Sequence, residues 1–132
     1  MRVESIDTNV LVRAAIDVGD DQTMPARDLL AEPECMFSVS LVSIAECMHV
    51  MVRHFGMSRS DSISSLRRAL SVQSIVCQRD IVLAALDIFE AHPKLSFEDC
   101  LAAEQASAGG ATPLWTFDAK LAKQHPAAKL VA

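Results

Sequence analysis

The chain has 132 residues, of which 51% are hydrophobic and 5% are aromatic. This length suits one compact domain over residues 1–132. The apolar runs are shorter than the ~20 residues of a membrane span, and no signal-peptide pattern begins the chain. Seventeen acidic residues against twelve basic ones give a net charge of -5, which argues against tight binding of nucleic acid by the whole surface. We therefore expect a cytoplasmic protein with a single core.

Four cysteines lie far apart in the sequence: Cys35, Cys47, Cys77 and Cys100. No two of them form a C-x-x-C pair, and each lies in an apolar stretch. We therefore expect buried free thiols rather than a zinc site or a disulfide framework.

The first part of the chain alternates strands with helices. We expect residues 3–6 to form a buried strand and residues 9–16 to form a short helix directly after it. A second helix is expected from about Met24 or Pro25 to Ala31, with the proline tolerated in its first turn. Residues 35–39 have the composition and length of the next strand.

A long helix is expected to follow this strand. Ser40 is suited to cap it, and Gly56 is suited to the C′ position after its last residue, Phe55. Seven apolar residues keep helical spacing and predict the side of the helix that faces the core: Leu41, Ile44, Ala45, Met48, Met51, Val52 and Phe55.

The rest of the chain continues the alternation of helices and strands. The expected elements are, in order, a helix over 60–70, a strand over 74–77, helices over 80–91 and 96–108, a strand over 112–116, a helix over 118–123 and a last strand over 129–131. Parallel strands need crossover connections, which helices supply. The sequence therefore predicts an α/β domain whose parallel sheet of four to five strands is covered on both faces.

Asp7 follows the first strand directly, in the triplet Asp7-Thr8-Asn9. In an open α/β sheet, ligands bind outside the carboxyl ends of the strands, so an acid placed there can reach a ligand. Asp, Thr and Asn are also the residues that begin helices. Capping is therefore the simpler explanation of the triplet when it is considered alone.

Glu46 lies in the middle of the long helix, among apolar residues, where it cannot act as a cap. A carboxylate in an apolar setting must be paired, hydrogen-bonded or bound to a metal, or else hold a proton. Its neighbours at helical spacing are Val42, His49, Val50 and Arg53. A contact with His49 is the ordinary alternative to a role as a ligand.

Asp99 and Asp118 each stand near the start of a helix, so capping can explain each of them alone. Ser96-x-x-Asp99 matches a capping box, and Asp118 separates a strand from the next helix. Support for a metal site therefore comes from all the candidate acids together rather than from any one of them. We expect strands 3–6 and 112–116 to be neighbours at the switch point of the sheet.

This topology would bring four carboxylates to one crevice: Asp7, Glu46, Asp99 and Asp118. Oxygen ligands without His or Cys suit Mg²⁺ or Mn²⁺. Without a cation, the four carboxylates would repel one another.

Four ordered motifs resemble those of the PIN domain, and specifically of its small VapC-like toxins. They are Ile6-Asp7-Thr8-Asn9-Val10-Leu11, Ser43-x-x-Glu46, Phe97-x-Asp99 before an alanine-rich helix, and Thr116-Phe117-Asp118. The resemblance covers nearly the whole chain in length and order. It implies a three-layer α/β/α sandwich and a metal-dependent endoribonuclease, commonly a homodimer, that a cognate antitoxin holds inactive.

The resemblance also implies roles for individual residues. Four acids would be catalytic and would hold Mg²⁺ or Mn²⁺: Asp7, Glu46, Asp99 and Asp118. Asn9 and Thr116 would support the site. Many relatives have another acid where this chain has Ser96, a difference that would weaken a second metal position or make it depend on substrate.

The expected reaction is hydrolysis of an RNA phosphodiester by a water that the metal makes nucleophilic. Five arginines in one segment are candidates for contacting RNA phosphates: Arg53, Arg59, Arg67, Arg68 and Arg79. A solvated face is the ordinary explanation for any one of them.

Other classes of protein fit the same sequence less well. A phosphoacceptor signalling domain would need a second acid beside Asp7, where Thr8 stands. A phosphatase of the D-x-D type would need an acid in place of Asn9. Two rivals stay open: a non-catalytic binding or regulatory module with the PIN fold, and an RNA-processing PIN nuclease outside a toxin–antitoxin pair.

Overall fold

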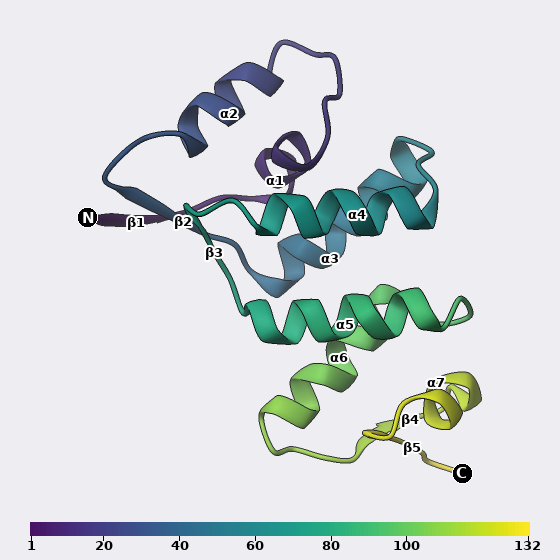
Figure 1. Ribbon diagram of the computed structural model, residues 1–132. Coiled ribbons are helices and arrows are strands. Elements are labelled where there is room, and N and C mark those ends of the chain that lie inside the picture. The colour runs from purple at the N-terminus through teal and green to yellow at the C-terminus, as the bar shows by residue number, and fades with distance from the viewer. The chain divides into compact units, whose positions relative to one another are not determined.

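The computed structural model describes residues 1–132 and divides them into two compact units, residues 1–79 and 80–132 (Figure 1). Every strand pairs in parallel with its neighbour, and helices separate successive strands along the chain. The α/β class expected from the sequence is therefore confirmed. None of the helices combines the length and the apolar character that a membrane span requires.

The first unit contains a parallel sheet of three strands in the order β1-β2-β3. These are β1 (Arg2–Ser5), β2 (Cys35–Ser38) and β3 (Ile75–Val76). Phe37 of β2 lies opposite Ile75 of β3, and both side chains are buried. The sheet is therefore anchored in the core at its central strand, which carries the alternating burial of a half-buried strand.

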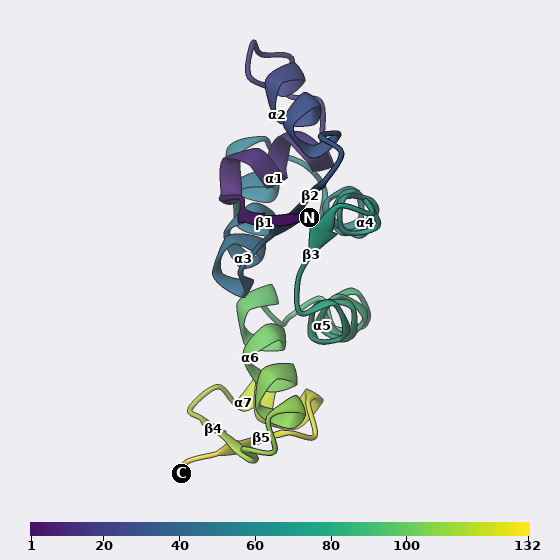
Figure 2. The same ribbon diagram turned by 90° about the vertical axis from the view of Figure 1, so that its left-hand side faces the viewer.

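The helical elements of the first unit are α1 (Thr8–Ala15), α2 (Thr23–Leu30), α3 (Leu41–His49), η1 (Val50–His54) and α4 (Arg59–Leu70). In Figure 2 the strands of this unit lie between α1 and α3 on one side and α4 on the other. Large fully buried side chains of these helices form the core: Leu11, Val12, Ile44, Met51, Ile63, Leu66 and Leu70.

The long helix expected over residues 40–55 forms, but its last turn is wider than an α-helical turn. Ser40 caps the helix, and Gly56 follows it at a φ of 64°, in the left-handed region that favours glycine. The Phe55 amide donates to the Val50 carbonyl five residues earlier (3.1 Å), so η1 is π-helical. The wider turn leaves Phe55 38% exposed, and the prediction that Phe55 belongs to the core is wrong.

The second unit consists of three helices and a parallel pair of strands: α5 (Arg79–Ala91, whose first residue ends the first unit), α6 (Phe97–Ala108), β4 (Leu114–Thr116), α7 (Ala119–Gln124) and β5 (Ala128–Leu130). Phe89 of α5 and Phe97 of α6 have ring centroids 5.5 Å apart, and both side chains are buried. These rings join the two longest helices of the unit.

A buried histidine connects α6, α7 and β5. His125 follows α7 directly and is 3% exposed. Its Nε2 lies 2.9 Å from Glu104 Oε1 on α6, and its Nδ1 accepts a hydrogen bond from the Ala127 amide (3.0 Å). Because Nδ1 is the acceptor, the neutral ring carries its proton on Nε2 and donates it to Glu104.

The four cysteines are free thiols, as the sequence predicts. Cys35, Cys47 and Cys100 are buried, and Cys77 is half-buried. Burial raises the pKa of the Cys47 thiol to about 12. A thiol that ionises so reluctantly behaves as a small apolar side chain rather than as a nucleophile.

All expected strands and helices are present, with small displacements of their ends. The expectation that the first strand is buried is wrong, because every residue of β1 is exposed (67% for Val3) and only Ile6, directly after the strand, is buried. Three strands belong to the first unit and two to the second. Within its own unit β1 pairs with β2, and β4 pairs with β5. Two expectations concern both units together and stay predictions. The first is that the chain is a single domain, and the second is that β1 and β4 are neighbours.

Candidate functional site

Asp7 lies between β1 and α1 and caps the helix. Its Oδ1 accepts a hydrogen bond from the Val10 amide (3.3 Å), which confirms the capping interpretation for the backbone. The side chain is exposed, and its second oxygen accepts no hydrogen bond. Capping therefore uses one carboxylate oxygen of Asp7 and leaves the other free for a ligand.

A hollow of about 410 Å³ lies beside Asp7, between α1 and α2. It is lined by Asp7, Asn9, Val10, Arg13, Gln22, Pro25, Ala26 and Leu29. Arg13, its one cationic side chain, bonds Asp20 Oδ2 at 2.6 Å. This hydrogen bond holds the pKa of the Asp20 carboxyl below its usual value. The charge of Arg13 is thus engaged by Asp20 rather than by Asp7.

A second hollow, of about 450 Å³, is lined mainly by residues of α3 and η1, and we refer to it as the Glu46 hollow. It is lined by Asn9, Glu46, His49, Val50, Arg53 and His54. The neighbours expected for Glu46 at helical spacing, His49, Val50 and Arg53, therefore do share its side of the helix. Asn9 lines both hollows, so the first unit gathers Asp7, Asn9 and Glu46 in one region.

Glu46 is exposed, and the expectation of an apolar setting for its carboxylate is wrong. The helix turns Ile44, Cys47 and Met48 toward the core and turns Glu46 to the solvent. The carboxylate forms no hydrogen bond or ion pair with His49, so the ordinary alternative to a ligand role is absent. Glu46 needs no partner for stability at this place, and its oxygens are free.

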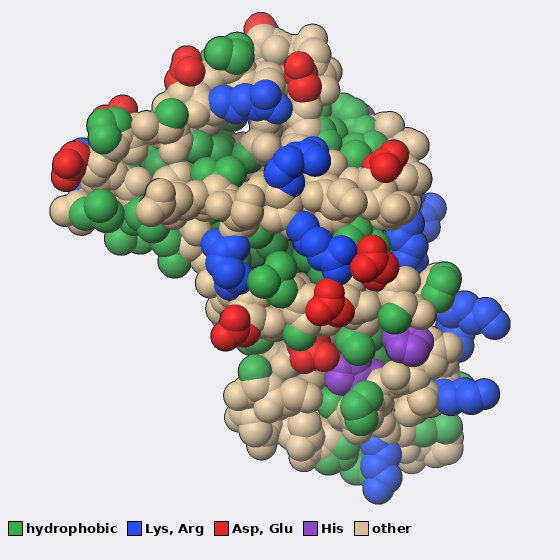
Figure 3. Space-filling model, in the orientation of Figure 1, with side chains coloured by type: hydrophobic (Ala, Val, Ile, Leu, Met, Phe, Trp, Pro, Cys, Tyr) green, Lys and Arg blue, Asp and Glu red, His purple; other side chains and the backbone are tan.

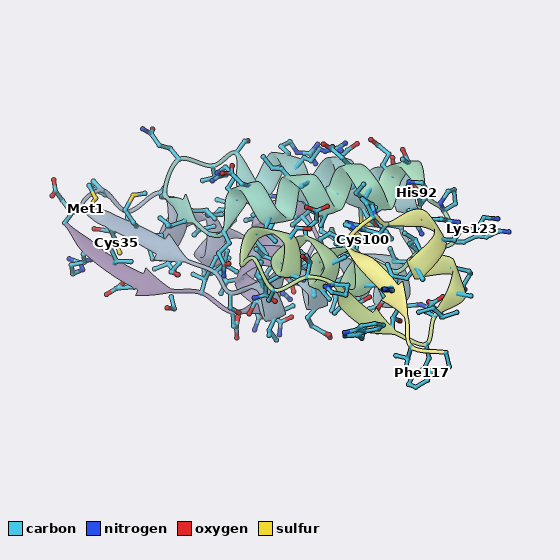
Figure 4. All side chains as sticks on the ribbon, turned by 90° about the horizontal axis from the view of Figure 1, so that it is seen from below. Met1, Cys35, His92, Cys100, Phe117 and Lys123 are labelled. Atoms are coloured by element: carbon cyan, nitrogen blue, oxygen red, sulfur yellow. The ribbon has the colours of Figure 1, made fainter.

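Asp118 caps α7 in the second unit. Its Oδ1 accepts hydrogen bonds from the amides of Lys120 (2.8 Å) and Leu121 (3.3 Å). The Thr116 hydroxyl in turn accepts a hydrogen bond from the Asp118 amide (2.9 Å). Phe117 between them is 80% exposed and points away from the ribbon (Figure 4). The backbone of Asp118 is thus held from both sides, while Oδ2 stays free.

Asp99 lies near the start of α6 and is half-buried. The Ser96 hydroxyl accepts a hydrogen bond from the Asp99 amide (3.1 Å), which forms one half of the expected capping box. The reciprocal bond, in which the Ser96 amide would donate to the Asp99 carboxylate, does not form. The cap therefore explains the Asp99 backbone but leaves its carboxylate without a role.

Two of the five candidate arginines are bonded to backbone carbonyls. Arg68 Nη2 donates to the Ala15 carbonyl (3.3 Å), and Arg79 donates to the carbonyls of Leu70 and Ile75 (3.2 Å for Ile75). Bonds of this kind tie neighbouring elements together and compete with a ligand for the same N–H groups. Both side chains therefore have a structural role already.

The other three arginines differ in exposure. Arg59 and Arg67 are half-buried, and each has an interaction partner in the protein. Arg53 is exposed and forms no hydrogen bond or ion pair, so its guanidinium group is free. Figure 3 shows basic side chains over α2 and along α4 on one face of the first unit, so positive charge is also present away from the Glu46 hollow.

Two histidines line the Glu46 hollow, and the sequence indicated neither of them as a ligand. His49 stands three residues after Glu46, a spacing that places both on one side of an α-helix. His54 is eight residues after Glu46 and belongs to the π-helical turn η1. No sequence pattern predicts that turn. Only the spacing of His49 could therefore have indicated a neighbour of Glu46 in the hollow.

The donor set of the four acids fits a hard cation. Each keeps at least one carboxylate oxygen without a hydrogen bond: Asp7, Glu46, Asp99 and Asp118. Free carboxylate oxygens are the ligands that Mg²⁺ and Mn²⁺ prefer. Within neither unit do three His, Cys, Asp or Glu side chains gather as a metal-binding group. Two of the acids belong to each unit.

Comparison with known proteins gives one family and several similar structures. The sequence matches the family model described as PIN domain over residues 5–125, a range that includes all four acids. The solved structures similar to the chain include VapC20 of Mycobacterium tuberculosis, a Sarcin-Ricin loop cleaving toxin, at 16% identity over 92% of this chain and 93% of that chain, with a TM-score of 0.43. VapBC2 from Rickettsia felis, bound to a DNA fragment from its promoter, is 22% identical over 98% of this chain and 97% of that chain, with a TM-score of 0.39. No curated protein matches the sequence.

Proposed function

Because the chain belongs to the PIN domain family, we propose that it is a metal-dependent endoribonuclease and the toxin of a toxin–antitoxin pair. The observation that carries the proposal is the gathering of Asp7, Asn9 and Glu46 around two hollows that share Asn9. Both carboxylates keep oxygens that no protein group uses. Exposed and unpaired acids beside a hollow are better suited to a ligand than to the stability of the fold.

We assign four acids to the binding of Mg²⁺ or Mn²⁺: Asp7, Glu46, Asp99 and Asp118. The bound cation would neutralise charge on the phosphate and lower the pKa of a water. The bond from the Val10 amide orients Asp7, and the Thr116 hydroxyl holds the backbone of Asp118. These contacts would hold each carboxylate in place before a ligand arrives.

Glu46 is suited to a role in hydrolysis as a ligand or as the group that orients the attacking water. Its carboxylate is exposed, and neither oxygen accepts a hydrogen bond from the protein. Hydrolysis forms a bond from the water oxygen to phosphorus and breaks one ester bond, and the leaving oxygen takes up a proton. The Asn9 amide, which lines the same hollow, supplies a neutral donor beside the phosphate.

The proposal includes partners as well as a substrate. As a toxin the protein would cleave RNA in the cytoplasm, form a homodimer and be held inactive by a cognate antitoxin. Large apolar side chains of the second unit remain exposed, including Trp115 (57%) and Phe117 (80%). Such side chains are typical of surfaces that bind another protein, which supports a protein partner.

The substitution Asp7→Asn tests the proposed function. Asn can still cap α1, so the fold and antitoxin binding are expected to persist, whereas RNA cleavage in Mg²⁺ or Mn²⁺ should fall at least ~100-fold. Asp28→Asn is the matched control, because Asp28 is an exposed acid of α2 that lines neither hollow. Cleavage by Asp7→Asn at the wild-type rate would contradict the assignment. Absence of metal-dependent cleavage by the wild-type protein would favour a non-catalytic module.

A further inference from the structure

We propose that the Glu46 hollow binds a phosphate of single-stranded RNA next to the bond that is cut. Arg53 is the principal contact, and His49 and His54 supply further hydrogen-bond donors. The inference rests on the proposed function, since it takes RNA to be the substrate held at Glu46. It adds a binding subsite to the acids that hold the cation.

The Glu46 hollow combines one acid with three basic side chains. Its volume of about 450 Å³ lies within the range of small-ligand sites, and it opens to the solvent through exposed side chains. Glu46 would repel a phosphate when no cation is bound. The guanidinium of Arg53 lies on the same side of the helix and offsets that repulsion, and the two imidazoles there can donate hydrogen bonds.

Arg53 is the arginine of the candidate set whose charge is free for a phosphate. Arg68 and Arg79 donate to backbone carbonyls, and Arg59 and Arg67 have partners in the protein. An exposed guanidinium group without a partner can present two parallel N–H groups to a phosphate. The structure therefore separates Arg53 from the other four, which the sequence could not do.

The π-helical turn accounts for the position of His54. In an uninterrupted α-helix, eight residues would rotate His54 by about 80° away from Glu46. The Phe55 amide instead closes a five-residue turn on the Val50 carbonyl, and the smaller rotation per residue keeps His54 in the hollow. Single π-helical turns occur frequently at functional sites.

A helix C-terminus also favours basic side chains through its dipole, so Arg53 and His54 could serve the helix alone. That explanation accounts for two basic side chains but not for the hollow that they share with Glu46 and Asn9. The two explanations predict different measurements. A dipole role affects the free energy of unfolding, whereas a phosphate subsite affects RNA affinity.

The test measures binding of a single-stranded RNA oligonucleotide in EDTA, which prevents cleavage, at several salt concentrations. Arg53→Ala should bind roughly tenfold more weakly than the wild-type protein. The slope of log K against log salt should become shallower by about 0.7, as for the loss of one phosphate contact on a single strand. Arg53→Lys should retain most of the slope, and His54→Gln should lose less affinity than Arg53→Ala.

Lys123→Ala is the matched control, because it removes one positive charge from a side chain that extends away from α7 (Figure 4). Its affinity and salt slope should stay close to those of the wild-type protein. The inference is overturned if Arg53→Ala binds RNA like the wild type or only as weakly as Lys123→Ala. It is also overturned if Arg53→Ala lowers stability alone, or if the wild-type protein binds no RNA.

Failure of the inference can be told apart from failure of the proposed function. A wild-type protein that cleaves RNA in Mn²⁺ while Arg53→Ala keeps full RNA affinity would remove the subsite and leave the nuclease. A wild-type protein that binds RNA through Arg53 but never cleaves it would keep the subsite and remove the nuclease.

Discussion

Asp7 has two carboxylate oxygens, and α1 uses one of them. Oδ1 accepts the Val10 amide, as a cap does, while the other oxygen is exposed. Asp118 follows the same rule, with Oδ1 bonded to two amides of α7. A carboxylate can therefore begin a helix and bind a ligand at the same time, and a capping role does not argue against catalysis.

Asp20 gives a prediction at the scale of a single residue. The hydrogen bond from Arg13 lowers the pKa of its carboxyl below the ordinary 3.8. A lowered folded-state pKa stabilises the fold above the unfolded value, and this contribution is lost as pH falls through the folded value. Asp20→Asn lacks the ionisable group, so its urea midpoint should fall less than that of the wild type between neutral pH and about pH 3.

Asp21→Asn is the control for this measurement, because Asp21 is an exposed neighbour with no hydrogen bond. It should keep the acid dependence of the wild type. Identical acid dependence in Asp20→Asn and the wild type would mean that the bond to Arg13 does not couple protonation to folding.

The extents of the helices follow from local signals, but the last turn of the long helix does not. Ser40 and Gly56 mark its two ends in the sequence, and the structure places both as expected. Burial changes across the wider turn of η1, since Met51 is fully buried and Phe55 is not. Helical spacing in the sequence does not indicate this hydrogen-bonding pattern.

The contacts of His125 give a prediction at the scale of elements. His125→Ala would leave the Glu104 carboxylate and the Ala127 amide without their buried partner. We expect the free energy of unfolding to fall by about 2–3 kcal/mol. Urea unfolding measures this loss.

His49→Ala is the matched control for this loss, since His49 is exposed and has no partner, and its stability should change by less than about 0.5 kcal/mol. Equal stability of His125→Ala and His49→Ala would show that the histidine does not tie α6 to β5.

Charge at the scale of the whole molecule sets what kind of RNA binding is possible. With a net charge of -5, the protein as a whole repels RNA. Binding must therefore come from a few local cations and from a metal ion that offsets the acids. We therefore expect one free arginine beside Glu46 to affect RNA binding more than the total number of basic residues does.

Binding of Mn²⁺ gives a prediction for the whole protein. A ligand that binds only the folded state stabilises it by about 2.7 kcal/mol at a hundred times its Kd, so Mn²⁺ should raise Tm by several degrees. Because we assign Asp7 and Asp99 to the cation, Asp7→Asn and Asp99→Asn should each reduce this increase. Thermal unfolding with and without Mn²⁺ measures it.

Asp28→Asn should show the full increase in Tm, since Asp28 is an exposed acid outside the assigned set. An increase that is the same in Asp99→Asn as in the wild type would remove Asp99 from the metal site. Loss of the effect in Asp7→Asn alone would restrict the cation to the first unit.

The sequence by itself determined the order of strands and helices, the helix ends at Asp7, Ser40, Ser96 and Asp118, and the α/β class. These features depend on side chains that bond their own neighbours or repeat with a fixed period, so a short stretch of sequence contains the information. The motifs that resemble a PIN domain are local in the same sense, and the family match over residues 5–125 bears them out.

Only the tertiary structure decided which charged groups are free. Glu46 is exposed although its sequence neighbours are apolar, and Arg53 is unpaired whereas Arg68 is bonded to Ala15, 53 positions away in the chain. Exposure and hydrogen-bond partners depend on contacts between segments far apart in the sequence, which no local pattern contains. The free carboxylate of Glu46 and the free guanidinium of Arg53 therefore emerge only when the helices pack, and with them the hollow that we assign to RNA.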